Sequence, residues 1–205
     1  DGSCIDVTKV DAATMKDLRK RVQIVFQDPY SCLNPRLSVW ELIAEPLMVN
    51  RVYSDKAAMR KRIRELMSTV GLAERLENSY PHELDGGRRQ RIGIARSLAL
   101  NPEFIVLDEP VSALDVCIQA QVLNLLNELQ KEFNYTYVFI SHNLSVVKHV
   151  SDRIAVMYLG QIAELSEYRE LFKNPMHPYT QALLSAIPLA KLDVNRERII
   201  LEGDV

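Results

Sequence analysis

Three apolar stretches of the sequence end in polar residues of the kind that act on phosphate groups. They are Gln27 after residues 22–26, Asp108 and Glu109 after residues 104–107, and Ser141 and His142 after residues 137–140. One carboxylate suits Mg²⁺, a second can take a proton from water, and a neutral donor can steady a γ-phosphate. Together these residues predict a Mg²⁺-phosphate site. An acidic pair after an apolar run is, by itself, also typical of a strand that leaves the core.

The stretches before these residues have the pattern of strands in a parallel sheet. Residues 104–107 are continuously apolar, as in a strand covered on both faces, and residues 137–140 have the pattern of another buried strand. From Asp115 the apolar residues follow helical spacing as far as Phe133, so a helix separates these strands. Strands separated by helices predict an α/β fold with a mostly parallel sheet. Ligands of such sheets collect beyond the carboxyl ends of the strands, where the polar residues are expected to meet.

The stretch between the first two strands is predicted to be mainly helical. Ser38 begins a capping box, so a helix should run from there towards Pro46. Residues 55–70 should form a second helix, and a third should follow Asp85. About residues 37–100 are therefore expected to form a helical subdomain inserted into the sheet domain.

A smaller set of elements should follow the third strand. Residues 143–150 have the pattern of a short helix, and residues 154–158 that of a strand. A hairpin through Gly160 should lead into a strand at residues 162–165.

The composition excludes several classes of protein. Of the 205 residues, 47% are hydrophobic and 25% are charged, which favours one globular domain with a minor subdomain over disorder. The formal charge of -2 gives no overall basic field, so nucleic acid is not expected as a partner. Cys4, Cys32 and Cys117 lack the spacing of a zinc site or disulfide framework. Because the sequence has no apolar run of ~20 residues and no signal peptide, we expect a soluble, cytoplasmic chain that meets a membrane only through a partner.

Five motifs resemble, in their order along the chain, the Q-loop, signature motif, Walker B motif, D-loop and switch histidine of ABC ATPases. They are residues 27–30, 84–91, 104–110, 112–115 and 140–142. The resemblance covers nearly the whole chain and implies a P-loop NTPase-type sheet flanked by helices. It also implies hydrolysis of ATP with Mg²⁺ by two such subunits, which close head to tail around two ATP molecules and pull on transmembrane partners.

The resemblance assigns a role to each polar residue at the strand ends. Gln27 would sense the γ-phosphate, contribute to the Mg²⁺ site and contact the membrane partner. Asp108 would hold Mg²⁺ through water, and Glu109 would be the catalytic residue that polarises the attacking water. His142 would contact the γ-phosphate and take part in catalysis.

The resemblance also implies residues that bind the nucleotide across a dimer. Asp85, Gly86, Gly87 and Arg88 would complete the ATP site of the opposite subunit, and Asp115 would bridge the two subunits. The family usually has Ser and Gln where this chain has Asp85 and Arg88. A weakened or one-sided ATP site is one interpretation, and a competent signature in which Asp85 and Arg88 pair is the other.

Two stretches narrow the resemblance to the ATPases of oligopeptide, dipeptide and nickel importers. They are an extended Q-loop at residues 27–35 and a carboxyl-terminal motif at residues 177–184, although the latter is also typical of an ordinary helix that starts with Pro. The implied partners are a second ABC ATPase subunit, transmembrane permease subunits and, indirectly, an extracytoplasmic solute-binding protein. The implied location is peripheral, on the cytoplasmic face of the membrane. The alternatives are a non-transport ABC ATPase that acts on DNA or the ribosome, and a catalytically inactive fragment.

The phosphate-cradling motif G-x-x-x-x-G-K-[ST] does not occur in the sequence. Residues 1–5 resemble a segment that follows this motif in the family, so we expect the chain to begin partway through a longer subunit and to be inactive alone. By the resemblance, residues 1–205 are a partial nucleotide-binding domain. Its expected parts are the helical subdomain with the signature (about 37–100), the Walker B to switch region (101–165) and a carboxyl-terminal extension (166–205).

Overall fold

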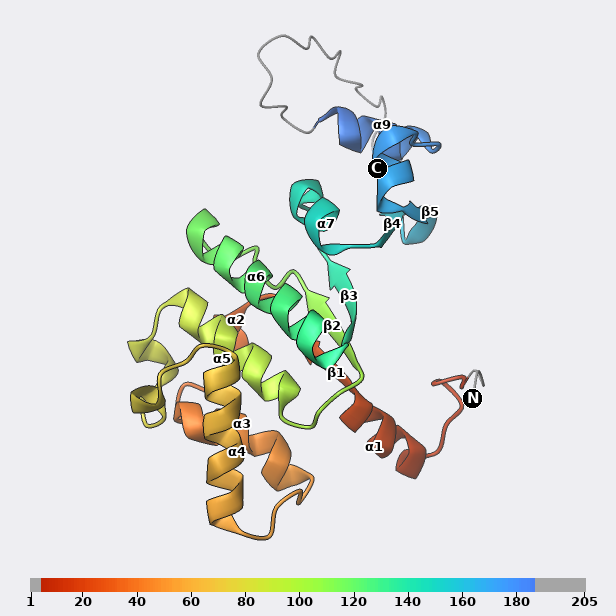
Figure 1. Cartoon of the computed structure of the whole chain (residues 1–205). Helices are drawn as coiled ribbons and strands as arrows, with labels where there is room; N and C mark the ends of the chain where they lie inside the picture. The colour runs from red at the N-terminus through yellow and green to blue at the C-terminus, as the bar shows by residue number, and fades with distance from the viewer. Residues whose placement is uncertain (1–4, 187–205) are drawn as a thin grey trace. The chain divides into compact units, whose positions relative to one another are not determined.

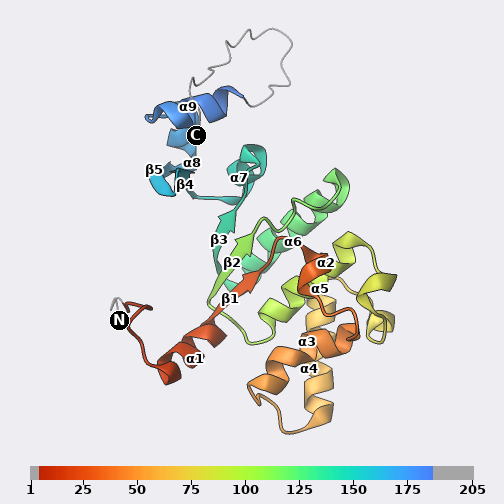
Figure 2. The ribbon, with the colours of Figure 1, turned by 180° about the vertical axis from the view of Figure 1, so that it is seen from behind.

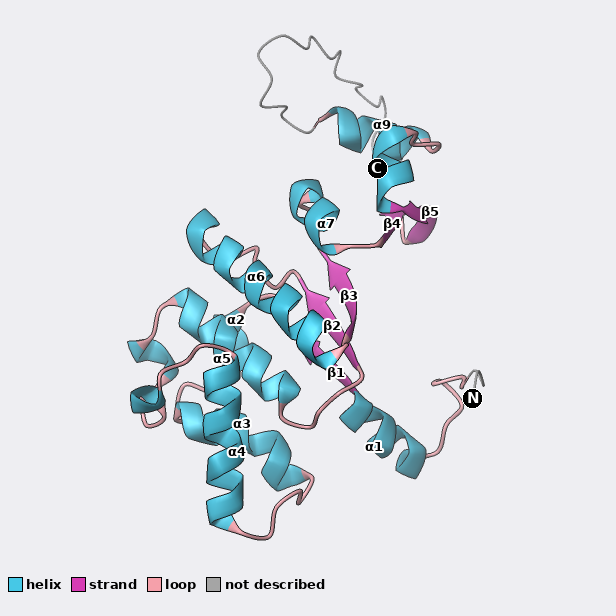
Figure 3. Ribbon diagram, in the orientation of Figure 1, coloured by secondary structure: helices cyan, strands magenta, loops and turns pink. Residues whose placement is uncertain are grey.

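The computed structural model of the chain describes residues 5–186 (Figures 1 and 3). The chain divides into two compact units, Asp1–Ile140 and Ser141–Val205. In the part that is described, no helix is long and apolar enough to cross a bilayer. Most of residues 1–5 and the end of the predicted extension lie outside the described residues. The predicted division at residues 37–100, 101–165 and 166–205 stays a prediction.

The first unit is built on a three-stranded parallel sheet in the order β1-β2-β3. Its strands are β1 (Val22–Val25), β2 (Phe104–Asp108) and β3 (Thr136–Ile140). The helix α1 (Ala12–Arg21), capped by Asp11, precedes β1 and was not expected from the sequence. Because the strands are parallel and in register, their carboxyl ends share one edge, as predicted.

Only one face of this sheet is covered by the described residues. The helix α6 (Val116–Phe133) lies along it, and Figure 2 shows the sheet from the side away from α6. Side chains alternate along each strand, so Ile105 and Leu107 on the α6 side are buried while Ile24 and Val138 on the other side are 42% and 44% exposed. The third strand, predicted to be buried, is therefore exposed on this side, and the second strand, predicted to be covered on both faces, is only half-buried there by the described residues.

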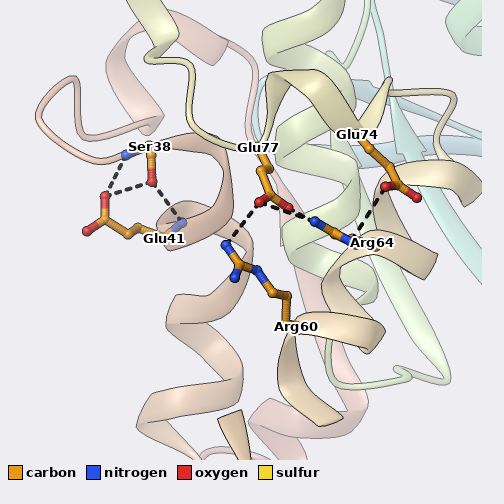
Figure 4. Close-up of polar contacts among 6 residues, drawn as sticks. All are labelled: Ser38, Glu41, Arg60, Arg64, Glu74 and Glu77. Carbon is orange, nitrogen blue, oxygen red and sulfur yellow. Dashed lines mark hydrogen bonds and ion pairs between the residues drawn. The ribbon is translucent and has the colours of Figure 1, made fainter. Parts of the chain in front are cut away.

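The remainder of the first unit is helical, as predicted. Its elements are α2 (Pro29–Cys32), α3 (Val39–Val49), α4 (Lys56–Thr69), the 3₁₀ turns η1 (Glu74–Leu76) and η2 (Pro81–Glu83), and α5 (Gly86–Leu98). The predicted capping box of Ser38 and Glu41 is present (Figure 4). Helix α3 nevertheless continues through Pro46 to Val49, about one turn beyond the predicted end. The helix can continue because the φ that proline fixes is close to the helical value, although the missing N–H of proline removes one hydrogen bond.

A buried carboxylate joins the helices of this region (Figure 4). The Glu77 side chain is 9% exposed and accepts hydrogen bonds of 3.0 Å from Arg60 Nη2 and from Arg64 Nε. The Glu77 carbonyl accepts a hydrogen bond from the backbone N–H of Trp40, at the start of α3. Glu77 therefore ties α4 to α3, and Arg60 is part of this network.

The second unit is a hairpin covered by short helices. Its elements are α7 (Leu144–Val150), β4 (Arg153–Tyr158), β5 (Gln161–Glu167), α8 (Tyr168–Lys173) and α9 (Pro178–Ser185). The two strands are antiparallel, with Gly160 at φ +75° in the turn, as predicted. The Glu164 carboxylate accepts hydrogen bonds from the backbone N–H groups of Met176 and His177, which holds the start of α9 against β5.

Candidate functional site

The structure brings Gln27 and Glu109 together at the carboxyl edge of the sheet. Gln27 follows β1 and Glu109 follows β2, two neighbouring parallel strands. The Gln27 Nε2 donates a hydrogen bond of 2.6 Å to Glu109 Oε2. An amide donor held on one carboxylate oxygen orients that carboxylate, and a carboxylate oriented in this way can act as a base.

The backbone of Glu109 is held in an uncommon conformation. Its φ of +42° lies in the left-handed region, which costs a non-glycine residue about 1 to 3 kcal/mol. The Glu109 N–H donates to the carbonyl of Ile140 at 3.0 Å, and the Glu109 carbonyl accepts from the hydroxyl of Ser112 at 3.0 Å. These contacts hold the strained turn, and with it the direction in which the Glu109 side chain leaves the sheet.

Asp108 is the last residue of β2 and pairs in register with Ile140. Its carboxylate is half-buried, and hard oxygen ligands of this type suit Mg²⁺. Within residues 5–186, no group of three or more His, Cys, Asp or Glu side chains forms a metal site. The donor set at this edge therefore fits an ion that takes one or two protein oxygens and completes its shell with phosphate and water, the usual state of Mg²⁺ in nucleotide sites.

The start of α5 carries the predicted signature residues. Asp85 is the N-cap and accepts a hydrogen bond of 2.8 Å from the backbone N–H of Arg88. The Arg88 Nε also lies 3.4 Å from Asp85 Oδ2, in an ion pair whose side chains are 48% and 59% exposed. Asp85 thus accepts a hydrogen bond from a free backbone N–H of the first turn of α5, as a serine N-cap would. Arg88 neutralises part of the charge of Asp85.

The two glycines of the signature allow α5 to approach α6 closely. A Cβ on Gly87 would lie 2.5 Å from Ile118 Cγ2, and one on Gly86 would lie 3.3 Å from Leu114 Cδ2. Asp115, the N-cap of α6, accepts hydrogen bonds from the N–H groups of Cys117 and Ile118. The predicted signature and D-loop residues are therefore neighbours, because two helices begin side by side.

His142 lies in the second unit, directly before α7. The neighbouring Ser141 hydroxyl accepts a hydrogen bond of 3.0 Å from the backbone N–H of Asn143, the N-cap of that helix. The start of α7 is thereby fixed next to His142. That His142 acts at one site with Glu109 stays a prediction.

One contact near the site was missed from the sequence. Arg89, in α5, is only 7% exposed. Its Nε donates to the Pro81 carbonyl at 2.6 Å, and its guanidinium lies 3.8 Å from the centre of the Tyr30 ring. The sequence held one signal for the burial of Arg89. It lies one helical turn before the apolar Ile92, and therefore on the same buried face of α5.

Two regions of the chain match described protein families. Residues 1–112 match the family described as ABC transporter. Residues 163–202 match the family described as Oligopeptide/dipeptide transporter, C-terminal region. Both matches agree with the resemblance drawn from the motifs.

Individual relatives agree with the family matches. The chain is 56% identical over 192 residues to the "Oligopeptide transport ATP-binding protein AppF" of Bacillus subtilis, which covers 93% of this chain and 58% of that protein. It is 50% identical over 200 residues to the "Dipeptide transport ATP-binding protein DppF" of Escherichia coli. This match covers 98% of this chain and 60% of that protein. The chain thus spans less than two thirds of the length of these curated relatives.

Solved structures agree on the fold. A dimeric post-hydrolysis state of the ATP-binding cassette MJ0796 bound to ADP and Pi is 31% identical, with a TM-score of 0.70 over 80% of this chain and 71% of that one. The cbiO1 protein of Clostridium perfringens, part of the ABC transporter complex cbiONQ, is 28% identical. Its TM-score is 0.70 over 80% of this chain and 64% of that one. The predicted ABC ATPase type of α/β fold is confirmed.

Proposed function

The chain belongs to the ABC transporter family, and from this premise we propose that it forms the hydrolytic part of an ATP-binding subunit that energises the import of peptides. The observation that carries the proposal is the hydrogen bond between Gln27 and Glu109 at the carboxyl edge of the parallel sheet. The family match of residues 163–202 and the names of the relatives support the peptide branch.

In this proposal Glu109 accepts the proton of the attacking water. The amide of Gln27 fixes one carboxylate oxygen, and the strained turn at Glu109 fixes the direction of the side chain. When bound, ATP with Mg²⁺ supplies the phosphoanhydride bond that is hydrolysed and an electrophilic phosphorus. Asp108 and Gln27 would hold the metal, and His142 would hold the γ-phosphate.

The start of α5 would face a second ABC ATPase subunit. The first N–H groups of a helix point away from it with a partial positive charge, which suits a phosphate. Gly86, Gly87 and Arg88 would contribute this surface, and Asp115 would meet the partner subunit beside it. Transmembrane permease subunits would receive the resulting movement, which would make the subunit peripheral to the membrane.

The test is the substitution Glu109→Gln in the complete transporter. Because a positioned general base contributes about 10²- to 10⁴-fold, ATP turnover should fall by that factor while ATP binding is retained. Glu103→Gln is the matched control, since Glu103 directly precedes β2 and its side chain forms an exposed ion pair with Arg21. Near-normal turnover in Glu109→Gln would contradict the proposal.

A further inference from the structure

Arg89 is a buried cation without a carboxylate partner among the described residues. Burial of a charge is costly unless other groups replace its water. Here the replacements are the Pro81 carbonyl, at 2.6 Å from Arg89 Nε, and the face of the Tyr30 ring, 3.8 Å from the guanidinium carbon. Both partners lie in segments outside α5, so Arg89 connects three parts of the chain.

One of these parts is the turn that follows Gln27. Tyr30 belongs to α2, and its backbone N–H donates at 2.8 Å to the side chain of Asp28, the residue after Gln27. A second contact holds α2 on α5, because Arg96 Nη1 lies 3.4 Å from the Cys32 carbonyl. Tyr30 as a residue is 62% exposed, so its contact with Arg89 is not a requirement of the core.

Another part is the segment that leads into α5. The Pro81 carbonyl accepts from the backbone N–H of Leu84 at 3.1 Å as well as from Arg89. Leu84 precedes the N-cap Asp85, whose carbonyl accepts from the Arg89 N–H at 3.1 Å. Arg89 therefore holds, with its side chain and its backbone, the segment that sets where α5 begins.

We propose that Arg89 is a positioning residue, which couples the Gln27 strand end to the start of α5 through Tyr30 and Pro81. Displacement of α2 would thus reach residues 81–88, and with them Gly86, Gly87 and Arg88, which the function proposed above places against the partner subunit. Arginine suits this role because its planar guanidinium stacks on a ring while Nε donates in the plane, a combination that lysine lacks. The functional part of the inference rests on the proposed function, whereas the structural part does not.

Hydrogen exchange on the 205-residue chain tests the structural part. Tyr30→Ala removes the stacked ring but leaves the Arg96 contact to α2, so the fold should persist. Loss of a cation-π contact of this kind should make local opening about two- to fivefold more frequent. We therefore expect the backbone amides of residues 82–88 to exchange about two- to fivefold faster in Tyr30→Ala. Tyr30→Phe should keep the slow exchange of the unsubstituted chain, and Tyr53→Ala is the control for loss of a partly exposed tyrosine in the same unit. Unchanged exchange at residues 82–88 in Tyr30→Ala would overturn the proposal.

ATP turnover by the complete transporter tests the functional part. Tyr30→Ala and Arg89→Lys should each lower kcat by about two- to fivefold with little change in the KM for ATP. The double variant should have the same kcat as Arg89→Lys, because both substitutions break the same contact between Tyr30 and Arg89. Additive losses, or the same loss in Tyr30→Phe, would overturn the coupling. Absence of turnover in the unsubstituted transporter would instead refute the proposed function, and the exchange experiment would still decide the structural part.

Discussion

The amide of Gln27 and the carboxylate of Glu109 lie 2.6 Å apart, although neither side chain belongs to a regular element. Each is the first or second residue after a strand, and the two strands are parallel neighbours. The contact is therefore a consequence of the strand register. If it orients the base, loss of the amide should affect the chemical step more than the binding of nucleotide.

Gln27→Ala should lower ATP turnover by about 10- to 100-fold, since a hydrogen bond to a charged group contributes about 1.5 to 3 kcal/mol. Gln23→Ala is the matched control, because Gln23 lies on β1, the strand before Gln27, and donates to the backbone carbonyl of Arg19 instead. Steady-state kinetics together with a nucleotide-binding assay separate the two effects. Equal losses of turnover in both variants would refute an orienting role for Gln27.

Gly87→Ala should destabilise the first unit by about 1 to 3 kcal/mol, because its Cβ would lie 2.5 Å from Ile118 Cγ2 and force the α5–α6 contact apart. A Cβ on Gly93, in the same helix, would meet no described residue within 4 Å, so Gly93→Ala should stabilise the chain by about 0.5 to 1 kcal/mol. Urea unfolding measures both. If Gly87→Ala were as stable as Gly93→Ala, the close packing of the two helix starts would be wrong.

The Arg64 guanidinium, assisted by Arg60, holds the pKa of Glu77 below its ordinary value even though burial acts in the opposite direction. The unfolded chain therefore takes up this proton at a higher pH than the folded chain, near pH 4.3. The stabilisation by Glu77 is complete above that pH and is lost as the pH falls through the lower pKa of the folded state.

Glu77→Gln should accordingly cost about 1 to 3 kcal/mol in the free energy of unfolding at pH 7, and less as the pH falls below about 4. The Glu74→Gln control, at a 65% exposed side chain 3.7 Å from Arg64, should have little effect at either pH. Denaturant titrations at pH 7 and pH 3.5 measure the free energy of unfolding of each variant relative to the unsubstituted chain. A cost for Glu77→Gln that is constant with pH would show that the carboxylate does not act through its charge.

Local patterns predicted much of the fold because the relevant signals are short in sequence. The capping box of Ser38, the N-cap of Asp85 and the alternation of strands and helices needed only neighbouring residues. Two features needed partners far along the chain and were missed. The contact of Tyr30 with Arg89 joins separate helices, and the exposed face of β1 to β3 depends on which elements cover the sheet.

Part of the placement of the candidate site residues could also be predicted. The parallel register could be inferred from helices between strands, and with it the common edge of Gln27 and Glu109. The left-handed backbone of Glu109 could not be inferred, since glutamate has no preference for that region and the turn is imposed by contacts to Ile140 and Ser112.

The signature of this chain differs from the usual one at Asp85 and Arg88, and the structure pairs these residues at 3.4 Å. Both side chains are about half exposed, so water screens much of the pairing energy. A phosphate charge ~5 Å from the Asp85 carboxylate would be repelled by about 3 kcal/mol at an effective dielectric of ~20, with no account taken of Arg88. Asp85 therefore caps the helix well but opposes the approach of an anion to it.

Asp85→Ser should leave the stability of the chain nearly unchanged, because serine is an equally good N-cap. In the complete transporter it should raise ATP-driven closure of the ATPase subunits, and with it turnover, by up to about a hundredfold, the factor that 3 kcal/mol represents. Asp85→Ser with Arg88→Gln should raise both further, because the family's usual pair of residues is then restored. Gel filtration with ATP and steady-state turnover, at matched folded fraction, measure the two effects. Lower or unchanged turnover in both variants would mean that Asp85 and Arg88, as a pair, form a competent signature, in which the Arg88 guanidinium compensates the carboxylate or meets the phosphate directly.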